Sequence, residues 1–165
     1  MPASIERTSG CPGSCPNFLL KLYKKGVRPE DIGIITPYQQ QVKTIRRILD
    51  ESNLQKPKIG SVEEFQGQER MVIIISTVRT SKSLLQSDLQ HALGFIASPK
   101  RLNVAISRAR ALLLIFGSPH LLSADKHWRN LLFRTINSGS YCGCDLPEHI
   151  DPTEPALNGD AHKEE

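Results

Sequence analysis

The sequence predicts an α/β fold in which a parallel β-sheet carries helices on both faces. Two observations support this class. Short apolar runs such as MVIIIST (71–77) and ALLLIFG (111–117) are typical of strands that are buried on both sides. Segments with apolar residues at helical spacing lie between such runs, and strands that alternate with helices indicate a parallel sheet.

The first regular element is expected after a flexible lead-in over residues 1–16, which are rich in Pro, Gly, Ser and Cys. A short helix is predicted over residues 17–26, ended by a glycine. The apolar strand DIGIIT (31–36) follows. Pro37 ends this strand, because proline has no N–H to offer to a neighbouring strand.

The middle of the chain continues the alternation. A second helix is predicted over residues 38–52, where apolar residues recur every three or four positions. PKIGSV (57–62) is predicted to be the second strand and residues 71–77 the third. ASPKRLNVAISRAR (97–110) reads as a helix, and residues 111–117 are predicted to form the fourth strand.

The last predicted helix covers residues 118–138, with Trp128, Leu131 and Leu132 as packing residues. Residues 145–165 are acidic and proline-rich, and we expect them to form a disordered tail. One domain over residues 17–144 is therefore expected.

Charge is distributed unevenly along the chain. Residues 17–144 hold 19 Lys/Arg against 9 Asp/Glu, whereas residues 145–165 hold 7 acids and 1 lysine. A basic body suggests a polyanionic partner such as nucleic acid or nucleotide phosphate, and an ordinary solvated basic face is the alternative. The apolar runs are too short to cross a bilayer and no secretory signal is evident, so we expect an intracellular protein without a membrane partner.

The four cysteines form two close pairs, Cys11/Cys15 and Cys142/Cys144. A tetrathiolate zinc site would need two to four residues between the ligands of each pair, and the second pair is tighter than that. We expect reduced thiols and no metal site.

Polar or aromatic groups follow each of the first three predicted strands. In a parallel sheet these positions share one edge, where ligands bind in open α/β folds. The residues at this edge are Thr36, Pro37 and Tyr38, then Ser61, Val62 and Glu63, and then Ser76, Thr77, Val78 and Arg79.

The segment SVEEFQGQE contains more polar groups than a simple connection requires. Ser61 and Glu64 match a capping box, whose side chains satisfy free N–H groups at a helix start. Gly67 permits a tight reversal, which would turn Gln66 and Glu69 back toward the cleft.

The segment PKRLNVAISRARAL carries several arginines on a predicted helix. Its core face is expected to contain Leu102, Ile106 and Ala109. Arg101, Ala105 and Arg108 lie on the adjacent face, and the helical phase turns Arg110 elsewhere. Two arginines beside the buried face suit bidentate phosphate recognition, although a plain surface helix with arginines is the alternative.

Taken together, these segments resemble a known family. GIITPYQQQV, GSVEEFQGQERMVIIISTVR and RLNVAISRARALLLIFG resemble helicase motifs IV, V and VI of superfamily 1, in that order. FQGQE and NVAISRAR look like the Upf-type branch. GSVEEFQGQE, IISTVR and the late YCGCDLP look most like the Armitage and Moloney-leukaemia-virus-ten group of RNA helicases.

The resemblance implies the second of two RecA-like domains, with ATP in the cleft between them. Arg108 matches the arginine finger that contacts the γ-phosphate, and Glu69 matches the acid that contacts the ribose. Gln66, Gly67 and Arg101 are expected on the same nucleotide side. The positions implied near the nucleic-acid backbone are Thr36, Pro37, Tyr38, Ser61, Val62, Thr77, Val78 and Arg79. Tyr38 could stack on a base or pack in the core.

The sequence departs from the family in one important respect. It contains no G-x-x-x-x-G-K-[ST] phosphate loop and no Asp-Glu pair at the end of an apolar strand to hold Mg²⁺. We therefore expect a fragment, a truncated isoform or a partial gene model, with Mg²⁺ held by the missing first domain. Whether this chain is itself an enzyme stays open, whereas the parent protein is expected to hydrolyse ATP.

The leading interpretation is half of an ATP-dependent RNA helicase that acts in RNA silencing. Its expected partners are single-stranded RNA, the first RecA-like domain and ribonucleoprotein components of RNA silencing, in the cytoplasm or in ribonucleoprotein granules. Two alternatives stay open. One is half of a DNA helicase or helicase-nuclease, because nothing in the motifs distinguishes ribose from deoxyribose. The other is a non-catalytic module that binds partners or competes with a full-length helicase.

Overall fold

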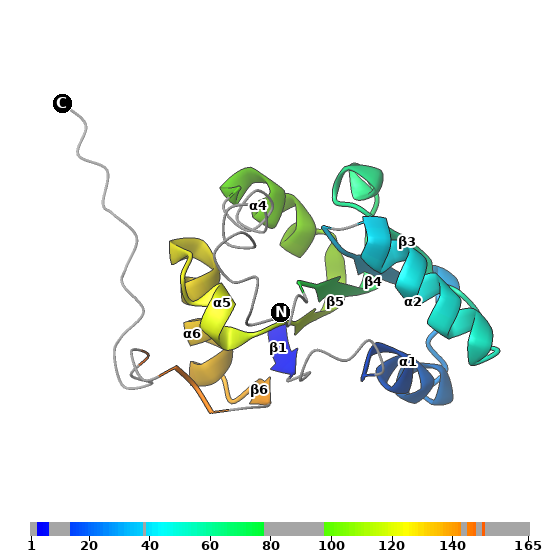
Figure 1. The fold of residues 1–165 in the computed structure, drawn as a ribbon, viewed down its shortest axis with the longest axis horizontal. Coiled ribbons are helices and arrows are strands. Elements are labelled where there is room, and N and C mark those ends of the chain that lie inside the picture. Colours follow the sequence, from blue (N-terminus) through cyan, green and yellow to red (C-terminus); the bar gives the residue numbers. More distant parts are fainter. Residues whose placement is uncertain are drawn as a thin grey trace.

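Six strands form one sheet in the computed structural model, in the order β3-β2-β4-β5-β1-β6, and each neighbouring pair is parallel (Figure 1). The structure describes residues 3–6, 14–37, 39–77, 98–142, 145–147 and 150. The strands are β1 (Ala3–Glu6), β2 (Ile32–Ile35), β3 (Lys58–Gly60), β4 (Arg70–Ser76), β5 (Ala109–Phe116) and β6 (Tyr141–Cys142).

Helices cover both faces of the sheet, as predicted (Figure 1). On one face lie α1 (Ser14–Lys24) and α2 (Gln39–Glu51). On the other lie α4 (Pro99–Ser107), α5 (Pro119–Leu122) and α6 (Lys126–Asn137). Two short 3₁₀ turns, η1 (Pro29–Asp31) and η2 (Glu63–Phe65), complete the elements. This arrangement confirms the predicted α/β class.

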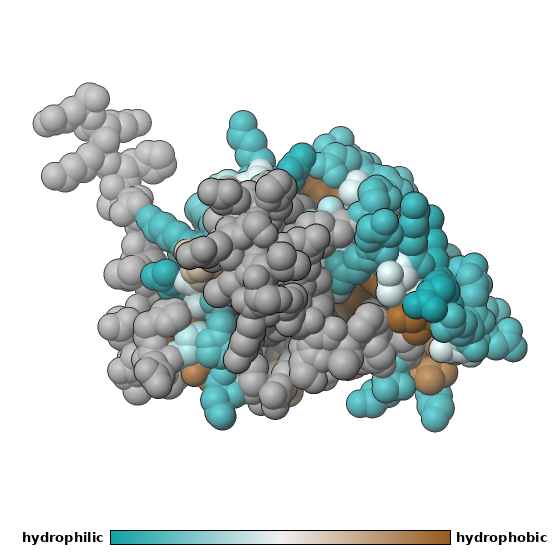
Figure 2. All heavy atoms as spheres, in the orientation of Figure 1, coloured by the Kyte–Doolittle hydropathy of each residue, from teal (hydrophilic) through white to brown (hydrophobic). Residues whose placement is uncertain are grey.

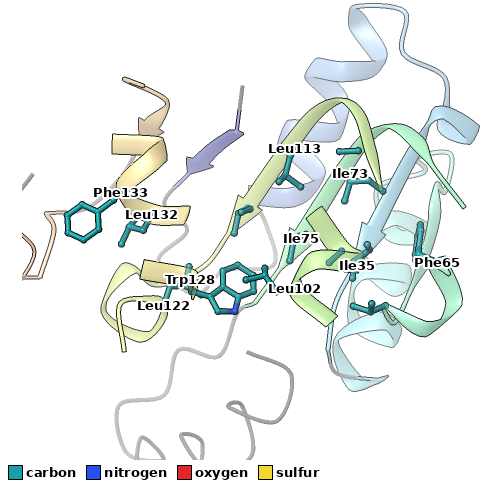
Figure 3. Packing of buried hydrophobic residues seen from close by; sticks show 14 of the residues in the cluster. Ile35, Phe65, Ile73, Ile75, Leu102, Leu113, Leu122, Trp128, Leu132 and Phe133 are labelled. Atoms are coloured by element: carbon teal, nitrogen blue, oxygen red, sulfur yellow. The ribbon is translucent and has the colours of Figure 1, made fainter. Parts of the chain in front are cut away.

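The strand register explains why the apolar runs are nearly continuous. Ile34, Ile74 and Leu114 are aligned across three neighbouring strands and belong to the cluster beneath α1 and α2. The next residue of each strand points to the opposite face, because side chains alternate along a strand. That second row packs in the cluster beneath α4, α5 and α6, where Figure 3 shows Trp128 and Phe65.

The two outer additions to the sheet were not predicted. Residues 3–6 form β1, which pairs with β5, and β6 pairs with β1 on its far side. Helix α1 begins at Ser14. The expectation of a flexible lead-in is therefore wrong for residues 3–6 and 14–16. A four-residue strand is stabilised by its partner, and the partner here lies more than 100 residues away in the sequence.

The start of the predicted disordered tail also differs in the structure. Pro147 and Ile150 are buried, and Leu146 packs against the same cluster as Ile150. Leu146, Pro147 and Ile150 therefore pack on the core, which the acidic composition of this segment does not reveal, whereas Asp145 is exposed. The expected helix over 118–138 is interrupted at Ser123–Asp125, where Asp125 caps the start of α6.

The surface of the described residues is mostly hydrophilic on the face that Figure 2 displays, with small hydrophobic areas at the lower right, where Figure 1 places α1. Among the described residues, the large apolar side chains classed as exposed are Leu20 and Met71. None of the described helices is long and apolar enough to cross a membrane.

Candidate functional site

A polar bridge joins the carboxyl ends of β2 and β4. The Thr36 hydroxyl donates a hydrogen bond to Oε1 of Gln41, and Nε2 of Gln41 donates to Ser76 Oγ over 2.6 Å. Thr36 and Ser76 are only 1% and 5% exposed. Because an unpaired buried hydroxyl is costly, one amide from the first turn of α2 satisfies both strand ends at once.

The carboxyl ends of β4 and β5 are also closely tied. The backbone N–H of Thr77 donates to the Phe116 carbonyl over 2.9 Å, and the Thr77 hydroxyl donates to the same oxygen over 3.1 Å. Gly117 lies so close to the Thr77 hydroxyl that a Cβ at this position would collide with it. This end of the sheet is therefore densely packed around its hydroxyl groups.

Several residues that were predicted to lie near a nucleic-acid backbone come together at this one edge, as expected from a parallel sheet. Thr36, Val62 and Thr77 are buried there, whereas Pro37 and Ser61 are half-buried. The hydroxyls of Thr36 and Thr77 already make internal hydrogen bonds. Tyr38, Val78 and Arg79 lie outside the described residues.

The segment 61–69 is the crossing between two parallel strands. It leaves the carboxyl end of β3 and enters the amino end of β4, so it must pass over β2, which lies between them. A helix usually makes such a crossover. Here one 3₁₀ turn does so, with Phe65 fully buried against Gly33 of β2. A Cβ on Gly33 would lie 2.5 Å from Cε1 of Phe65, so only glycine leaves room for this crossing.

The start of the crossing is held by its two adjacent glutamates. The backbone N–H of Ser61 donates to Oε1 of Glu64 over 2.9 Å, which is one half of the predicted capping box. Glu63 pairs with Nε of Arg101 over 2.9 Å. The pKa of Glu63 is lowered, chiefly by its own backbone N–H and further by the Ser61 hydroxyl and the Arg101 charge, against a smaller opposing effect of burial. Arg101, predicted on the nucleotide side, is thus engaged by a carboxylate.

The end of the crossing makes the predicted reversal. Gly67 has φ +69°, a conformation that favours glycine. Gln66, Gly67 and Glu69 are exposed, whereas Gln68 turns partly inward. The reversal delivers Glu69 directly to the amino end of β4.

The arginine segment folds differently from its prediction. Helix α4 ends at Ser107, Arg108 caps it, and Ala109 already belongs to β5. The helical phase used to orient Arg110 is therefore wrong, since Arg110 is an exposed strand residue. The buried residues of α4 are Leu102 and Ala105, so Ala105 belongs to the core face and not to the arginine face. Pairing of Ala109 with Arg70 of β4 explains why strand begins here.

Arg108 lies at the reversal between α4 and β5 and is half-buried. Its Nε donates to the Val104 carbonyl over 3.1 Å, and its Nη2 donates to Ser107 Oγ over 3.0 Å. These bonds fold the guanidinium back over the end of its own helix. Next to it, β4 and β5 shift register between Arg70 and Val72, an irregularity of the kind that redirects side chains near functional sites.

The predicted residues thus form two groups. Thr36, Ser61 and Thr77 lie at the carboxyl edge, whereas Glu69 and Arg108 lie at the amino ends of β4 and β5. The seven-residue strand β4 separates the two groups by about 20 Å at 3.3 Å per residue. The segment 61–69 is the covalent connection from one group to the other.

Sequence reasoning missed four polar residues of these groups: Gln41, Lys58, Gln68 and Arg70. Each makes side-chain hydrogen bonds within one group. A signal was present for Gln41, since a polar residue at the third position of α2 stands close to the preceding strand end. Lys58 offered none, because a lysine that begins an edge strand is normally solvated.

The cysteines give no sign of a metal centre in the part of the chain that the structure describes. There, Cys142 is exposed with a free thiol, and no three His, Cys, Asp or Glu side chains gather as metal ligands. The side chains of Cys11, Cys15 and Cys144 lie outside that description.

Comparisons with known proteins match this chain to an AAA-domain family and to helicases. A family model described as "AAA domain" matches residues 14–120. "Probable RNA helicase armi" of Drosophila melanogaster is 53% identical over 131 residues, covering 79% of this chain and 11% of that protein. "RNA helicase Mov10l1" of Homo sapiens is 51% identical over 133 residues, covering 81% and 11%. "ATP-dependent helicase NAM7" of Saccharomyces cerevisiae is 37% identical over 132 residues, covering 76% and 13%. The chain therefore spans only about a tenth of the length of these relatives.

Proposed function

Because the chain belongs to the AAA-domain family, in the form found in the C-terminal part of superfamily 1 helicases of the Armitage and Mov10 kind, we propose that it acts as the second RecA-like domain of an ATP-dependent RNA helicase. In this role it contributes an arginine finger and part of an RNA groove. A first RecA-like domain is its partner in forming the ATP cleft.

One observation carries this proposal: a single nine-residue crossing links the two groups of site residues. Ser61 begins the crossing at the carboxyl edge, and Glu69 ends it beside the backbone of Arg108. Phe65 anchors its middle in the core. A segment of this kind can transmit a change at a nucleotide to a nucleic-acid strand, as a motor domain requires.

On the nucleotide side, Arg108 supplies charge to the γ-phosphate and Glu69 contacts the ribose. The guanidinium of Arg108 now bonds a helix carbonyl and a serine hydroxyl, both neutral partners that a phosphate can replace. Gln66 and Gly67 present exposed polar groups beside Glu69. Arg101 takes part only after it leaves Glu63.

On the nucleic-acid side, the carboxyl edge contacts the RNA backbone through Pro37, Ser61 and the neighbouring backbone groups. Thr36, Val62 and Thr77 support this edge from beneath, because their side chains are buried. Tyr38, Val78 and Arg79 complete the proposed contact. Contacts of this type are largely sequence-independent.

ATP and Mg²⁺ are the proposed substrate and cofactor of the whole helicase. The sequence of this chain contains no phosphate loop, and its described residues bring no set of metal ligands together. In this proposal, residues of the first RecA-like domain hold Mg²⁺. The proposed setting is RNA silencing in the cytoplasm or in ribonucleoprotein granules, with ribonucleoprotein components as further partners.

The test uses the 165-residue chain in fluorescence anisotropy with a single-stranded RNA and a single-stranded DNA of equal length. We expect weak RNA binding that falls by an order of magnitude or more between 50 and 200 mM salt, since the contacts are to phosphates. We also expect no ATP hydrolysis above background. RNA binding that is indifferent to salt contradicts the backbone contact. Preference for DNA favours a DNA helicase, and hydrolysis that disappears in Arg108→Ala contradicts the half-site assignment.

A further inference from the structure

The ammonium group of Lys58 contacts several residues of the crossing between Glu64 and Gln68. Lys58 is the first residue of β3, and its Nζ donates to the Glu64 carbonyl over 2.8 Å and to Oε1 of Gln68 over 2.9 Å. The same Nζ lies 5.1 Å from the centroid of the Phe65 ring, a cation–π distance. One side chain therefore contacts three residues of the crossing.

We call these contacts of Lys58 with Glu64, Phe65 and Gln68 the clamp. Gln68 extends the clamp to the start of β4. Its Nε2 donates to the Glu64 carbonyl over 3.2 Å, and its Oε1 also accepts from Nη2 of Arg70 over 3.3 Å. Nη1 of Arg70 donates to the Glu69 carbonyl over 2.8 Å. The backbone on both sides of Glu69 is thus held by cationic side chains, directly or through Gln68.

Lys58 and Arg70 donate their hydrogen bonds to neutral oxygen atoms of the crossing. Within the described residues, no carboxylate lies within ion-pair distance of either Lys58 or Arg70, and both cations bond neutral oxygens of the crossing. Hydrogen bonds from charged donors are shorter and stronger than those between neutral groups. Such bonds can hold a segment whose one regular element is a short 3₁₀ turn.

The clamp restricts the position of Glu69. Its side chain is exposed, and Gly67, two residues earlier, has the positive φ of the reversal. A carboxylate selects a ribose more strongly when its position is fixed before the nucleotide arrives, because less freedom is then lost on binding. We propose that Lys58 is a positioning residue for Glu69, acting through Gln68 and the Glu64 carbonyl, and that it thereby sets the ribose selectivity of the nucleotide side. This inference rests on the proposed contact between Glu69 and the ribose.

The chain offers a matched control. Lys56 precedes β3 by two residues, is exposed, and pairs with Asp50 on α2 over 2.5 Å, away from the crossing. Lys58→Met removes the ammonium and keeps most of the apolar stem, and Lys56→Met makes the same change where no role is proposed. Gln68→Ala breaks the clamp while leaving Lys58 in place.

The experiment titrates the ¹⁵N-labelled 165-residue chain with ADP and with 2′,3′-dideoxy-ADP and follows the amide signals of residues 66–70 by NMR. We expect the wild type to prefer ADP by about tenfold, the scale of one hydrogen bond to a charged group. Lys58→Met and Gln68→Ala should lose most of this preference while binding the dideoxy nucleotide as the wild type does. Lys58→Arg should keep part of the preference for ADP, and Lys56→Met should keep all of it.

The outcomes separate the two levels of the proposal. If Glu69→Ala keeps the wild-type preference, or if the wild type has none, the ribose contact of Glu69 is wrong and the positioning role fails with it. If Glu69→Ala loses the preference but Lys58→Met and Gln68→Ala retain it, the ribose contact stands and the positioning role is wrong. A loss of affinity for both nucleotides to the same extent indicates a purely structural clamp and also overturns the inference.

Discussion

The backbone N–H of Arg70 donates a hydrogen bond to the carbonyl of Arg108 over 3.0 Å. This bond joins the residue that follows Glu69 to the residue proposed as the arginine finger. The two segments are 38 positions apart in the chain, yet they begin adjacent parallel strands. If Arg108 acts as the proposed arginine finger, we expect a displacement of its backbone to be transmitted through this bond to the end of the crossing that carries Glu69.

The first prediction concerns Arg108. In a protein that joins this chain to a RecA-like domain with a phosphate loop, Arg108→Ala should lower RNA-stimulated ATP hydrolysis by about 10³-fold or more, because arginine fingers supply rate factors of that size. Arg108→Lys should fail nearly as badly, since a point charge does not reproduce the planar fork of arginine. RNA affinity without nucleotide should stay close to that of the wild type.

Arg110→Ala is the matched control for Arg108. Arg110 is an exposed residue of β5 that follows the reversal, so its removal should change hydrolysis only mildly. Equal loss in both variants would show that the reversal does not distinguish the two arginines. Full turnover in Arg108→Ala would remove the arginine-finger assignment.

A second prediction concerns the space beside Gly33. Gly33→Ala should destabilise the fold by about 1–3 kcal/mol, the usual cost of overpacking. The new Cβ would lie 2.5 Å from Cε1 of Phe65 and 2.8 Å from Cδ1 of Ile73. Urea denaturation measures the change. In a Phe65→Leu background the penalty should shrink, and an unchanged penalty would mean that the crossing does not depend on this contact.

The third prediction tests the polar bridge at the carboxyl edge. Gln41→Ala should lower the free energy of unfolding by about 1–3 kcal/mol, because it leaves two buried hydroxyls without their shared partner. Gln40→Ala, at the preceding exposed position, should stay within about 0.5 kcal/mol of the wild type. Equal effects of the two substitutions in denaturant titrations would argue against the bridge.

The fourth prediction is a pH dependence at Glu63. The pKa of Glu63 in the fold lies below its ordinary value of about 4.5, so the charged form stabilises the fold above that pH, and this contribution is lost as the pH falls through the lowered pKa. The wild type should therefore exceed Glu63→Gln in free energy of unfolding at pH 7, and this stability gap should shrink toward zero as the pH is lowered to 3. With half of the side chain exposed, the gap should not exceed about 1 kcal/mol.

Arg101→Ala provides the control for Glu63. The gap should become smaller in this background but persist, because the backbone N–H of Glu63 is a larger cause of the lowered pKa than the Arg101 charge. Unfolding curves at several pH values measure both gaps. A gap that widens toward low pH would reverse the sign of the proposed interaction.

Local sequence determined much of the fold. The four strands β2, β3, β4 and β5 and the helices between them follow from apolar runs and helical spacing, which depend on neighbouring residues alone. The reversal at Gly67 was also predictable from sequence, because a positive φ is a local preference of glycine. The parallel sheet then placed Thr36, Ser61 and Thr77 at one edge.

Tertiary structure decided the rest, because it depends on partners distant in the chain. Residues 3–6 become a strand through pairing with β5 and β6, and α4 stops at Ser107 because the next residues pair with β4. That stop separates Arg108 from Arg110 in a way that no helical phase predicts. Likewise, Lys58 reads as a solvated lysine in the sequence. Only the folding of the crossing over Gly33 places the Glu64 carbonyl and the Gln68 amide within hydrogen-bonding reach of its ammonium group.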